Sequence, residues 1–224
     1  MLNEQYSRTI GLIGEEEFLN IRKKKIFIAG LGGVGGTAFE ALVRIGFSHF
    51  VIVDRDIVAA SNLNRQILYT KNDIGKAKVE VAKSHALNID DELEIETING
   101  DVIDALRNDV DFIVDCIDDV KAKVELIKFA TANNIPLITS MGMANKLDPS
   151  KITVSTINKS TVDPLAKKMR YELKQAGVDY SSIACVYSSE EPKKDGAKLY
   201  SLITVTSTAG LYIANYVLNF LKRK

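Results

Sequence analysis

A glycine-rich turn is the part of the sequence whose residue types and spacing point most directly to chemistry. Gly30, Gly32 and Gly35 follow the apolar run 26–29 and precede a segment with helical apolar spacing. In this pattern one glycine makes a tight turn, the next lets the backbone approach a phosphate, and the third lets helix and strand pack closely. The free N–H groups at the helix start favour an anion. The turn, which also contains Gly33, therefore predicts a nucleotide site.

Charged side chains follow the next strands of the same pattern. Asp54 ends the apolar run 49–53 and is placed to bind ribose hydroxyls. Arg65 and Lys78 come after this strand, and Asp118 follows another apolar run. Because ligands bind beyond the carboxyl ends of parallel strands, we expect these side chains to meet beside the glycine turn.

Two kinds of enzyme use such a turn, a nicotinamide dehydrogenase and an ATP-dependent adenylating enzyme. ATP attacked at its α-phosphate needs cations on the leaving pyrophosphate and a carboxylate that holds a divalent metal. Arg65, Lys78 and Asp118 meet this need, whereas His49 and His85 are not placed for hydride transfer. We therefore favour adenylation. The three charged residues also disfavour a nucleotide-sensing module without catalysis.

The composition limits the setting and the partners. The chain has 224 residues, and its 29 Lys and Arg residues equal its 29 Asp and Glu residues, so nucleic-acid binding would need local patches. Cys116 and Cys185 make no Cys-x-x-Cys pair, which excludes a disulfide framework or a four-cysteine zinc site within this chain. Since the N-terminus also lacks a signal-peptide pattern, we expect a cytoplasmic protein.

The end of the chain is a long uncharged segment. Residues 199–221 carry no charged side chain, and a length of this kind permits a membrane span. Ser, Thr and Asn residues and Gly210 interrupt the segment, however. We therefore expect a short buried strand over Leu202–Thr206 and a core or interface helix from Ser207. Peripheral membrane contact by this tail is the less favoured alternative.

Strands alternate with helices through most of the chain, which predicts an α/β fold with a parallel sheet. The fold expected is a Rossmann-like, mostly parallel sheet with helices on both faces and an antiparallel C-terminal extension. Residues 1–140 would form the nucleotide-binding core with an N-terminal arm. Residues 141–224 would extend the same domain, cover the nucleotide edge and supply substrate contacts.

Five motifs in one order resemble those of the ubiquitin-activating-type adenylating superfamily, which includes the ThiF-like activators of sulfur-carrier proteins. The motifs are Gly30–Gly35, Asp54–Asp56, Ser61–Gln66, Gly75–Lys78 and Asp115–Asp119. The resemblance covers about residues 6–140.

The resemblance implies a role for each matching residue. Arg65 would contact the phosphates, Lys78 would neutralise the developing charge, and Asp118 would hold Mg²⁺. Arg8 resembles an N-terminal arginine that, in dimeric members, reaches ATP in the partner subunit, which implies a homodimer. The ATP itself would be held by Gly30, Gly32, Gly33, Gly35, Asp54, Asp56, Asn62, Arg65 and Lys78.

The second half of the chain is similar to the tRNA threonylcarbamoyladenosine dehydratases, in the segments Leu147–Pro149, Lys151–Val154, Asp163–Arg170 and Cys185–Glu190. This similarity implies ATP-dependent cyclisation of N6-threonylcarbamoyladenosine in tRNA through an adenylated carboxylate. The alternative is an adenylyltransferase that activates the C-terminus of a ubiquitin-like sulfur-carrier protein. The partners expected are the modified tRNA and a second copy of the chain, with a sulfur-transfer or carrier protein as another candidate.

Two features of the second half of the chain, a cysteine and a basic helix, each have two possible interpretations. Cys185 would be a sulfur or acyl relay, or a small buried residue of a strand, and we favour the buried residue. The basic helix 165–176 is the candidate tRNA surface, although solvated charge on an amphipathic helix explains it equally well. The further basic residues of this surface would be Lys193, Lys194, Lys198, Lys222, Arg223 and Lys224.

Overall fold

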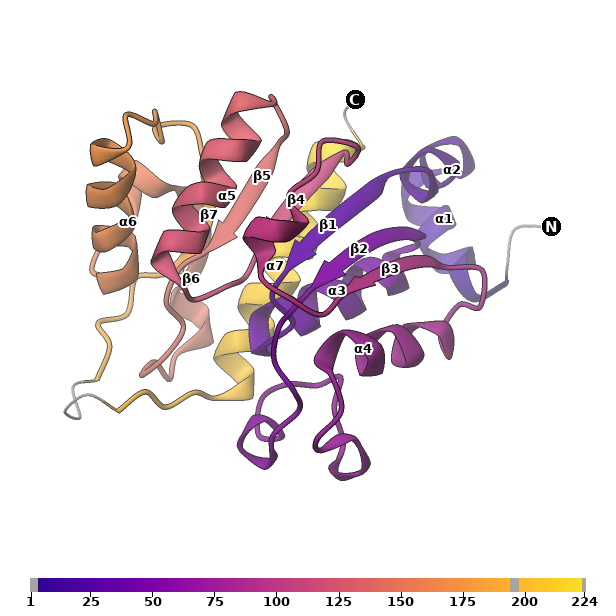
Figure 1. The fold of residues 1–224 in the computed structure, drawn as a ribbon. Helices are drawn as coiled ribbons and strands as arrows, with labels where there is room; N and C mark the ends of the chain where they lie inside the picture. The colour runs from indigo at the N-terminus through magenta and orange to yellow at the C-terminus, as the bar shows by residue number, and fades with distance from the viewer. Residues whose placement is uncertain (1–3, 194–197, 223–224) are drawn as a thin grey trace.

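Short apolar runs form one mixed sheet at the centre of the molecule (Figure 1). The computed structural model describes residues 4–193 and 198–222. Within them the strand order is β3-β2-β1-β4-β5-β7-β6, and every neighbouring pair is parallel except β7 and β6. The strands are β1 (Lys25–Ala29), β2 (His49–Val53), β3 (Glu94–Ile98), β4 (Phe112–Asp115), β5 (Leu137–Ser140), β6 (Ile152–Thr156) and β7 (Ala184–Ser188).

Helices cover both faces of this sheet, and Figure 1 shows α5 in front of it and α7 behind. Short 3₁₀ turns, among them Ala60–Asn62 and Val102–Ala105, lie in the connections. The helices are α1 (Ser7–Ile13), α2 (Glu15–Arg22), α3 (Gly33–Ile45), α4 (Lys78–Leu87), α5 (Val120–Ala132), α6 (Pro164–Gln175) and α7 (Ile203–Leu221).

Successive side chains of a buried strand point to opposite faces of the sheet, so the core is divided between these two faces. In β1, Ile26 and Ile28 pack in the cluster that contains α3, α4 and α7, whereas Phe27 and Ala29 pack in the cluster that contains α5. A third cluster joins α5 to α6 and includes Cys185 of β7. The expected Rossmann-like sheet with helices on both faces is confirmed, and among the described strands of this sheet only β6 and β7 pair antiparallel.

The prediction for the end of the chain is wrong in one respect. Leu202–Thr206 is not a strand, because α7 already begins at Ile203. Ile203 and Thr204 favour a strand as isolated residues, but Val205, Ala209 and Ile213 recur at helical spacing and are fully buried against the core. Within residues 4–193 and 198–222, no helix has both the length and the apolar character needed to cross a bilayer.

The helix α7 packs against α3 at very short range. A Cβ on Gly210 would lie 2.5 Å from the Val34 carbonyl oxygen and 2.7 Å from the Thr37 Cβ. The hydroxyl groups of Thr37 and Ser207 lie within hydrogen-bonding distance, at 3.1 Å. Glycine is therefore needed at position 210, and the last helix of the chain directly supports the helix that follows the glycine turn.

Candidate active site

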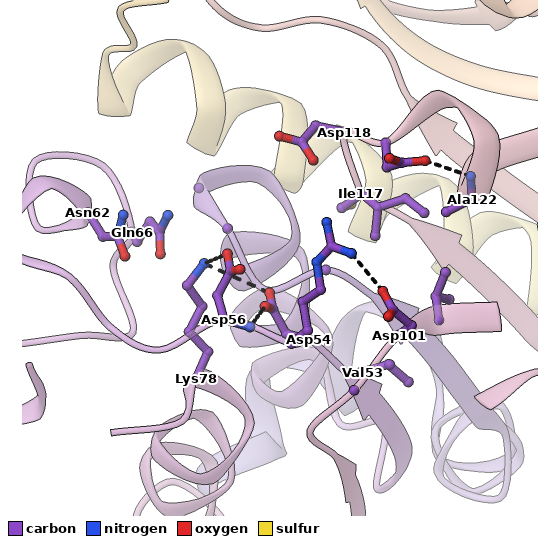
Figure 2. A pocket seen from close by; sticks show the side chains of 18 of the residues that line it. Val53, Asp54, Asp56, Asn62, Gln66, Lys78, Asp101, Ile117, Asp118 and Ala122 are labelled. Atoms are coloured by element: carbon purple, nitrogen blue, oxygen red, sulfur yellow. Dashed lines mark hydrogen bonds and ion pairs between the residues drawn. The ribbon is translucent and has the colours of Figure 1, made fainter. Parts of the chain in front are cut away.

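A cavity of about 440 Å³ opens at the carboxyl ends of β1, β2 and β4. The glycine turn, the polar loop after β2, the start of α4 and the start of α5 contribute to its wall, as Figure 2 shows. The predicted site residues that line it are Gly30, Gly32, Gly33, Asp54, Asp56, Asn62, Arg65, Lys78 and Asp118. The structure therefore brings together nine of the residues that the sequence places in one site.

The glycines of the turn have distinct structural roles. Gly30 has a φ of +87°, and a Cβ there would lie 2.9 Å from the Cys116 carbonyl oxygen. Gly35 does not line the cavity but packs α3 onto β1, because its Cβ would lie 1.9 Å from the Gly30 carbonyl oxygen. No side chain caps α3, which begins after Gly32, so its first N–H groups are available to an anion.

Asp54, Asp56 and Lys78 form the charged wall on one side of the cavity (Figure 2). The Leu31 N–H donates to Asp54 Oδ2 at 2.7 Å, which joins the end of β2 to the glycine turn. Lys78 Nζ donates to Asp56 Oδ2 at 2.7 Å and lies 4.0 Å from Asp54 Oδ2. The Lys78 side chain is only 5% exposed, so its charge is held inside the wall and not on the surface.

The loop after β2 carries Asn62, Arg65 and Gln66. Asn62 Oδ1 accepts from the Ala59 N–H at 3.0 Å, so this amide closes its own turn. Arg65 Nη1 donates to the Ser61 carbonyl oxygen at 2.9 Å and to a neighbouring amide oxygen, so the guanidinium lies along the loop. Arg65 lines the cavity and is half-buried, which leaves its other N–H groups for an anion.

Two adjacent carboxylates at the start of α5 have different environments. Asp119 is the N-cap of the helix, because its Oδ1 accepts from the Ala122 N–H at 2.8 Å. Asp118 is exposed, lines the cavity and takes part in no hydrogen bond or ion pair within residues 4–193 and 198–222. It is therefore the carboxylate available to a cation.

A buried network supports the turn that carries Asp118. Asp115, at the end of β4, and Lys123, on α5, both have fully buried side chains, and their charged atoms lie 2.9 Å apart. Thr139 of β5 donates to the same carboxylate at 2.7 Å, and the Ile117 N–H donates at 3.3 Å. The network therefore links two strands, a helix and the cavity turn.

Several residues that the sequence reasoning did not single out belong to this site. Gln66 lines the cavity and is buried, and Arg55 Nη1 donates to Asp101 Oδ1 at 2.7 Å across its rim. No residue after Ala122 lines the cavity among those described, so the C-terminal extension does not form this wall, and its covering of the nucleotide edge stays a prediction. That extension instead packs behind the turn, where a Cβ on Gly33 would lie 2.9 Å from Thr206 Oγ1.

The remaining candidate residues are Arg8, which lies outside the cavity, and two cysteines whose thiols are unreactive. Arg8 is exposed on α1 and does not line the cavity of its own chain. Cys116 lines the cavity, but burial, and then the charge of Asp115, raises the pKa of its thiol. Cys185 is fully buried on β7, and burial raises its pKa to about 12. Neither thiol is poised to act as a thiolate at neutral pH.

The basic helix of the extension is α6, at one edge of the molecule (Figure 1). Lys167, Lys168 and Lys174 are exposed on it. Arg170 is not a free charge, because its Nη1 donates to the carbonyl oxygens of Ile157 and Ser160 at 3.1 and 3.0 Å. Lys194, Arg223 and Lys224 lie outside the described residues.

Comparison with known proteins gives the family. The ThiF family model matches residues 6–224. The tRNA threonylcarbamoyladenosine dehydratase of Bacillus subtilis is 32% identical over 84% of this chain and 76% of its own length. Dehydratase 2 of Saccharomyces cerevisiae is 35% identical over 90% of this chain but only 46% of its own length, so the chain spans about half of that relative. The molybdopterin-synthase adenylyltransferase of Escherichia coli is 31% identical over 61% of this chain and 55% of its own length.

Solved structures agree with the sequence relatives. Crystal structures of the Escherichia coli tRNA N6-threonylcarbamoyladenosine dehydratase, in complexes with AMP and with ATP, each align with a TM-score of 0.92 and 30% identity. These alignments cover 97% of this chain and 94% and 93% of the two structures. The chain therefore belongs to the ThiF family, and its relatives in sequence and structure include the tRNA threonylcarbamoyladenosine dehydratases.

Proposed function

We propose that the protein is an ATP-dependent dehydratase that cyclises N6-threonylcarbamoyladenosine in tRNA. The observation that carries this proposal is the placement of two groups in one cavity beside the glycine turn: the buried ammonium of Lys78 and the carboxylate of Asp118, which has no partner among the described residues. A dinucleotide site needs neither group, whereas attack on the α-phosphate of ATP needs both. The dehydratases named above support the choice of substrate.

The reaction asks the protein mainly to bind, orient and neutralise charge. A carboxylate oxygen of the threonyl group attacks the α-phosphorus, and the bond to pyrophosphate breaks. A nucleophile of the same modified base then attacks the activated carbonyl, AMP leaves with the former carboxylate oxygen, and the ring closes with release of a proton. Since the second attack is intramolecular, orientation supplies much of the acceleration and no side-chain nucleophile is required.

Each cavity group has a place in this scheme. Arg65 and Lys78 would stabilise the negative charge that develops on the leaving pyrophosphate. Asp54 would hold the ribose, and the start of α3 with its glycines would hold the phosphates. In this part of the proposal Lys78 leaves Asp56, its partner at 2.7 Å, when the nucleotide binds.

Mg²⁺ fits the residues that are present. Within the described residues, no group of three or more His, Cys, Asp or Glu side chains could hold a metal by itself. Mg²⁺ commonly binds through one or two carboxylates together with substrate phosphates and water. Asp118 would hold the ion, whose charge would offset that of the triphosphate.

Three partners complete the proposal. The tRNA would contact the exposed lysines of α6, Lys167, Lys168 and Lys174, and binding through them would weaken steeply with salt. A second copy of the chain would bring its Arg8 to the ATP, and Leu12, which is 89% exposed on the same helix, would be covered in that dimer. A sulfur-transfer protein is the third candidate, and residues 141–224 are proposed as an extension of the nucleotide-binding domain.

Nucleotide turnover measured with different substrates tests the proposal. AMP release and exchange of pyrophosphate into ATP are measured with tRNA that carries the modification, with unmodified tRNA and with a sulfur-carrier protein. We expect stimulation by the modified tRNA alone. Stimulation by the carrier protein alone would support the adenylyltransferase alternative, and binding of a nicotinamide dinucleotide in place of ATP would refute both.

A further inference from the structure

One side chain of the cavity wall has no role in the chemistry described above. Gln66 is 5% exposed and lines the cavity, and its Oε1 has no hydrogen-bond partner. Within residues 4–193 and 198–222, no other buried side-chain nitrogen or oxygen atom lacks one. Buried polar atoms are nearly always paired, so an unpaired atom beside a ligand site points to a hydrogen bond that forms only when the ligand binds.

The loop holds Gln66 in place through the hydrogen bonds of its backbone groups. The Gln66 N–H donates to the Asn62 carbonyl oxygen at 3.0 Å, and the Gln66 carbonyl oxygen accepts from the Tyr69 N–H at 3.3 Å. The side chains of Asn62 and Arg65 each bond to the backbone of the same loop. The backbone therefore fixes the position of Gln66 without satisfying its amide.

The nitrogen end of the amide lies over the glycine turn. A Cβ on Gly32 would stand 3.9 Å from Gln66 Nε2, with nothing closer. Gly32 lines the cavity and precedes α3, whose first N–H groups have no side-chain cap. The amide N–H of Gln66 thus lies close to the start of α3, and a group of N–H donors at a helix start suits a phosphate oxygen.

The oxygen end requires a donor that already belongs to the wall, because this atom is closed to solvent. Lys78 is the buried cation of the same wall, and Figure 2 shows Gln66, Lys78 and Asp56 on one side of the cavity, across from Asp118. An ammonium has three N–H donors. Lys78 Nζ donates one hydrogen bond to Asp56 at 2.7 Å and lies 4.0 Å from Asp54, so further N–H groups of the ammonium are available.

We propose that Gln66 is a positioning residue of the nucleotide site that joins Lys78 to the phosphate chain. Its Nε2–H binds a phosphate oxygen, and its Oε1 accepts a hydrogen bond from Lys78 Nζ when the ammonium turns from Asp56 toward the phosphates. This inference rests on the proposed function, because it takes the ligand to be a nucleotide triphosphate held by Lys78.

The test replaces the amide with an apolar side chain of similar length, in Gln66→Met. Calorimetry gives the Kd of a methylene-bridged ATP analogue with Mg²⁺, and thermal unfolding is followed without nucleotide. We expect the Kd to rise about ten- to hundredfold, the range typical of a lost hydrogen bond to a charged group. The unfolding temperature of the free protein should stay the same or rise, because the variant removes an unpaired buried atom. A lower unfolding temperature with unchanged affinity would overturn the inference in favour of a purely structural role.

Two further variants sharpen the result. Gln66→Glu keeps the length and the acceptor for Lys78 but removes the donor and adds a negative charge, so it should bind the analogue more weakly than Gln66→Met. Binding as tight as that of the unmodified protein would contradict the phosphate contact. Gln175→Met removes an exposed amide at the end of α6 and should change neither measurement.

Binding of the analogue by the unmodified protein distinguishes a failure of the role of Gln66 from a failure of the proposed function. If it binds the analogue and Gln66→Met binds it equally well, only the role of Gln66 is refuted. If the unmodified protein does not bind the analogue at all, the proposed function itself fails.

Discussion

In the part of the chain that the structure describes, each half of the molecule contains one fully buried lysine–aspartate pair, and the two pairs serve different parts of the fold. In the first half, Lys123 and Asp115 lie 2.9 Å apart under the turn that carries Asp118. In the second half, Lys146 Nζ lies 2.8 Å from Asp163 Oδ2 and donates to the Gly142 carbonyl oxygen at 2.7 Å. The first pair touches the cavity turn through Ile117, whereas the second connects loops of the extension.

The same difference, between residues at the cavity and residues that support the fold, holds for the two halves in general. The cavity is lined only by residues up to Ala122 among those described, and the later segments support it from behind through α7. Groups that line the cavity are therefore concentrated in the first half, and groups that hold them in place are distributed over both. The comparison predicts that changes in the first half affect binding and turnover, while most changes in the second half affect stability first.

Breaking the two buried pairs should give the largest effects. Lys123→Met and Lys146→Met each leave a buried carboxylate without its cation, which destabilises a protein by about 3–5 kcal/mol. Only Lys123→Met should also weaken binding of an ATP analogue, because Asp115 accepts from the Ile117 N–H of the cavity turn at 3.3 Å. Denaturant unfolding and calorimetry measure the two effects. Equal losses of affinity in both variants would contradict the division between the halves.

Asp118→Asn should give the next largest effect, on turnover alone. The side chain is exposed and has no partner within the described residues, so the free energy of unfolding should change by less than about 0.5 kcal/mol. AMP release should fall by about 10²–10³-fold, the typical loss when one charge-stabilising group is removed.

The neighbouring carboxylate provides a matched control for Asp118→Asn. Asp119→Ala removes the N-cap of α5, whose Oδ1 accepts from the Ala122 N–H at 2.8 Å, and should lower stability by about 1 kcal/mol. Its loss of turnover should be far smaller. A pair of variants with the opposite pattern would assign the cation to Asp119.

Gly210→Ala tests the support that the second half gives to the first. The new Cβ would lie 2.5 Å from the Val34 carbonyl oxygen, so α7 and α3 must move apart. We expect a loss of about 1–3 kcal/mol of stability and weaker nucleotide binding, since Val34 belongs to the first turn of α3. Gly11→Ala is the control, because a Cβ there has nothing within 4 Å and alanine favours the helix. Normal affinity in Gly210→Ala would show that the first turn tolerates the shift.

The residues of the two halves also differ in how far their positions could be predicted from the sequence. Asp54 and Asp118 were predictable because they follow the ends of two parallel strands, and parallel strands end at one edge of a sheet. Lys78 begins α4, so strand boundaries alone do not place it. The start of α7 over residues 203–206 was not predictable, because its β-branched residues favour a strand until the burial of Val205 against α3 and the core is known. Because α7 packs against α3, which lies far earlier in the sequence, the residues near 205 carry no local pattern that reveals this packing.

Gln66 illustrates the same limit within the site. It stands in the motif Ser61–Gln66, but nothing in its residue type separates it from the other neutral amides of that motif, Asn62 and Asn64. Its distinguishing property, a buried oxygen without a donor, exists only when the loop, the glycine turn and α4 are assembled. Residue roles that depend on partners from several elements therefore require the structure.

Cys185→Ala should have the smallest effect, and it separates the dehydratase from a sulfur-transfer enzyme. The thiol is fully buried on β7, and burial raises its pKa to about 12, with the charge of Asp163 adding to the shift. A raised pKa means that this group's contribution to stability is complete below its unfolded pKa of about 8.5 and is lost as the pH rises toward 12. Alkylation of the folded protein at Cys185 should therefore stay slow from pH 7 to about pH 10.

Turnover decides the chemical role of Cys185. If the ring closes by intramolecular attack on the adenylated carboxylate, Cys185→Ala should retain AMP release and formation of the cyclic base within about twofold, with about 1 kcal/mol lost from the core. A relay cysteine would instead be required for every turnover, and its loss would stop product formation while pyrophosphate exchange continued. Because β7 places this thiol in the cluster packed between α5 and α6, away from the residues that line the cavity, we expect the first result.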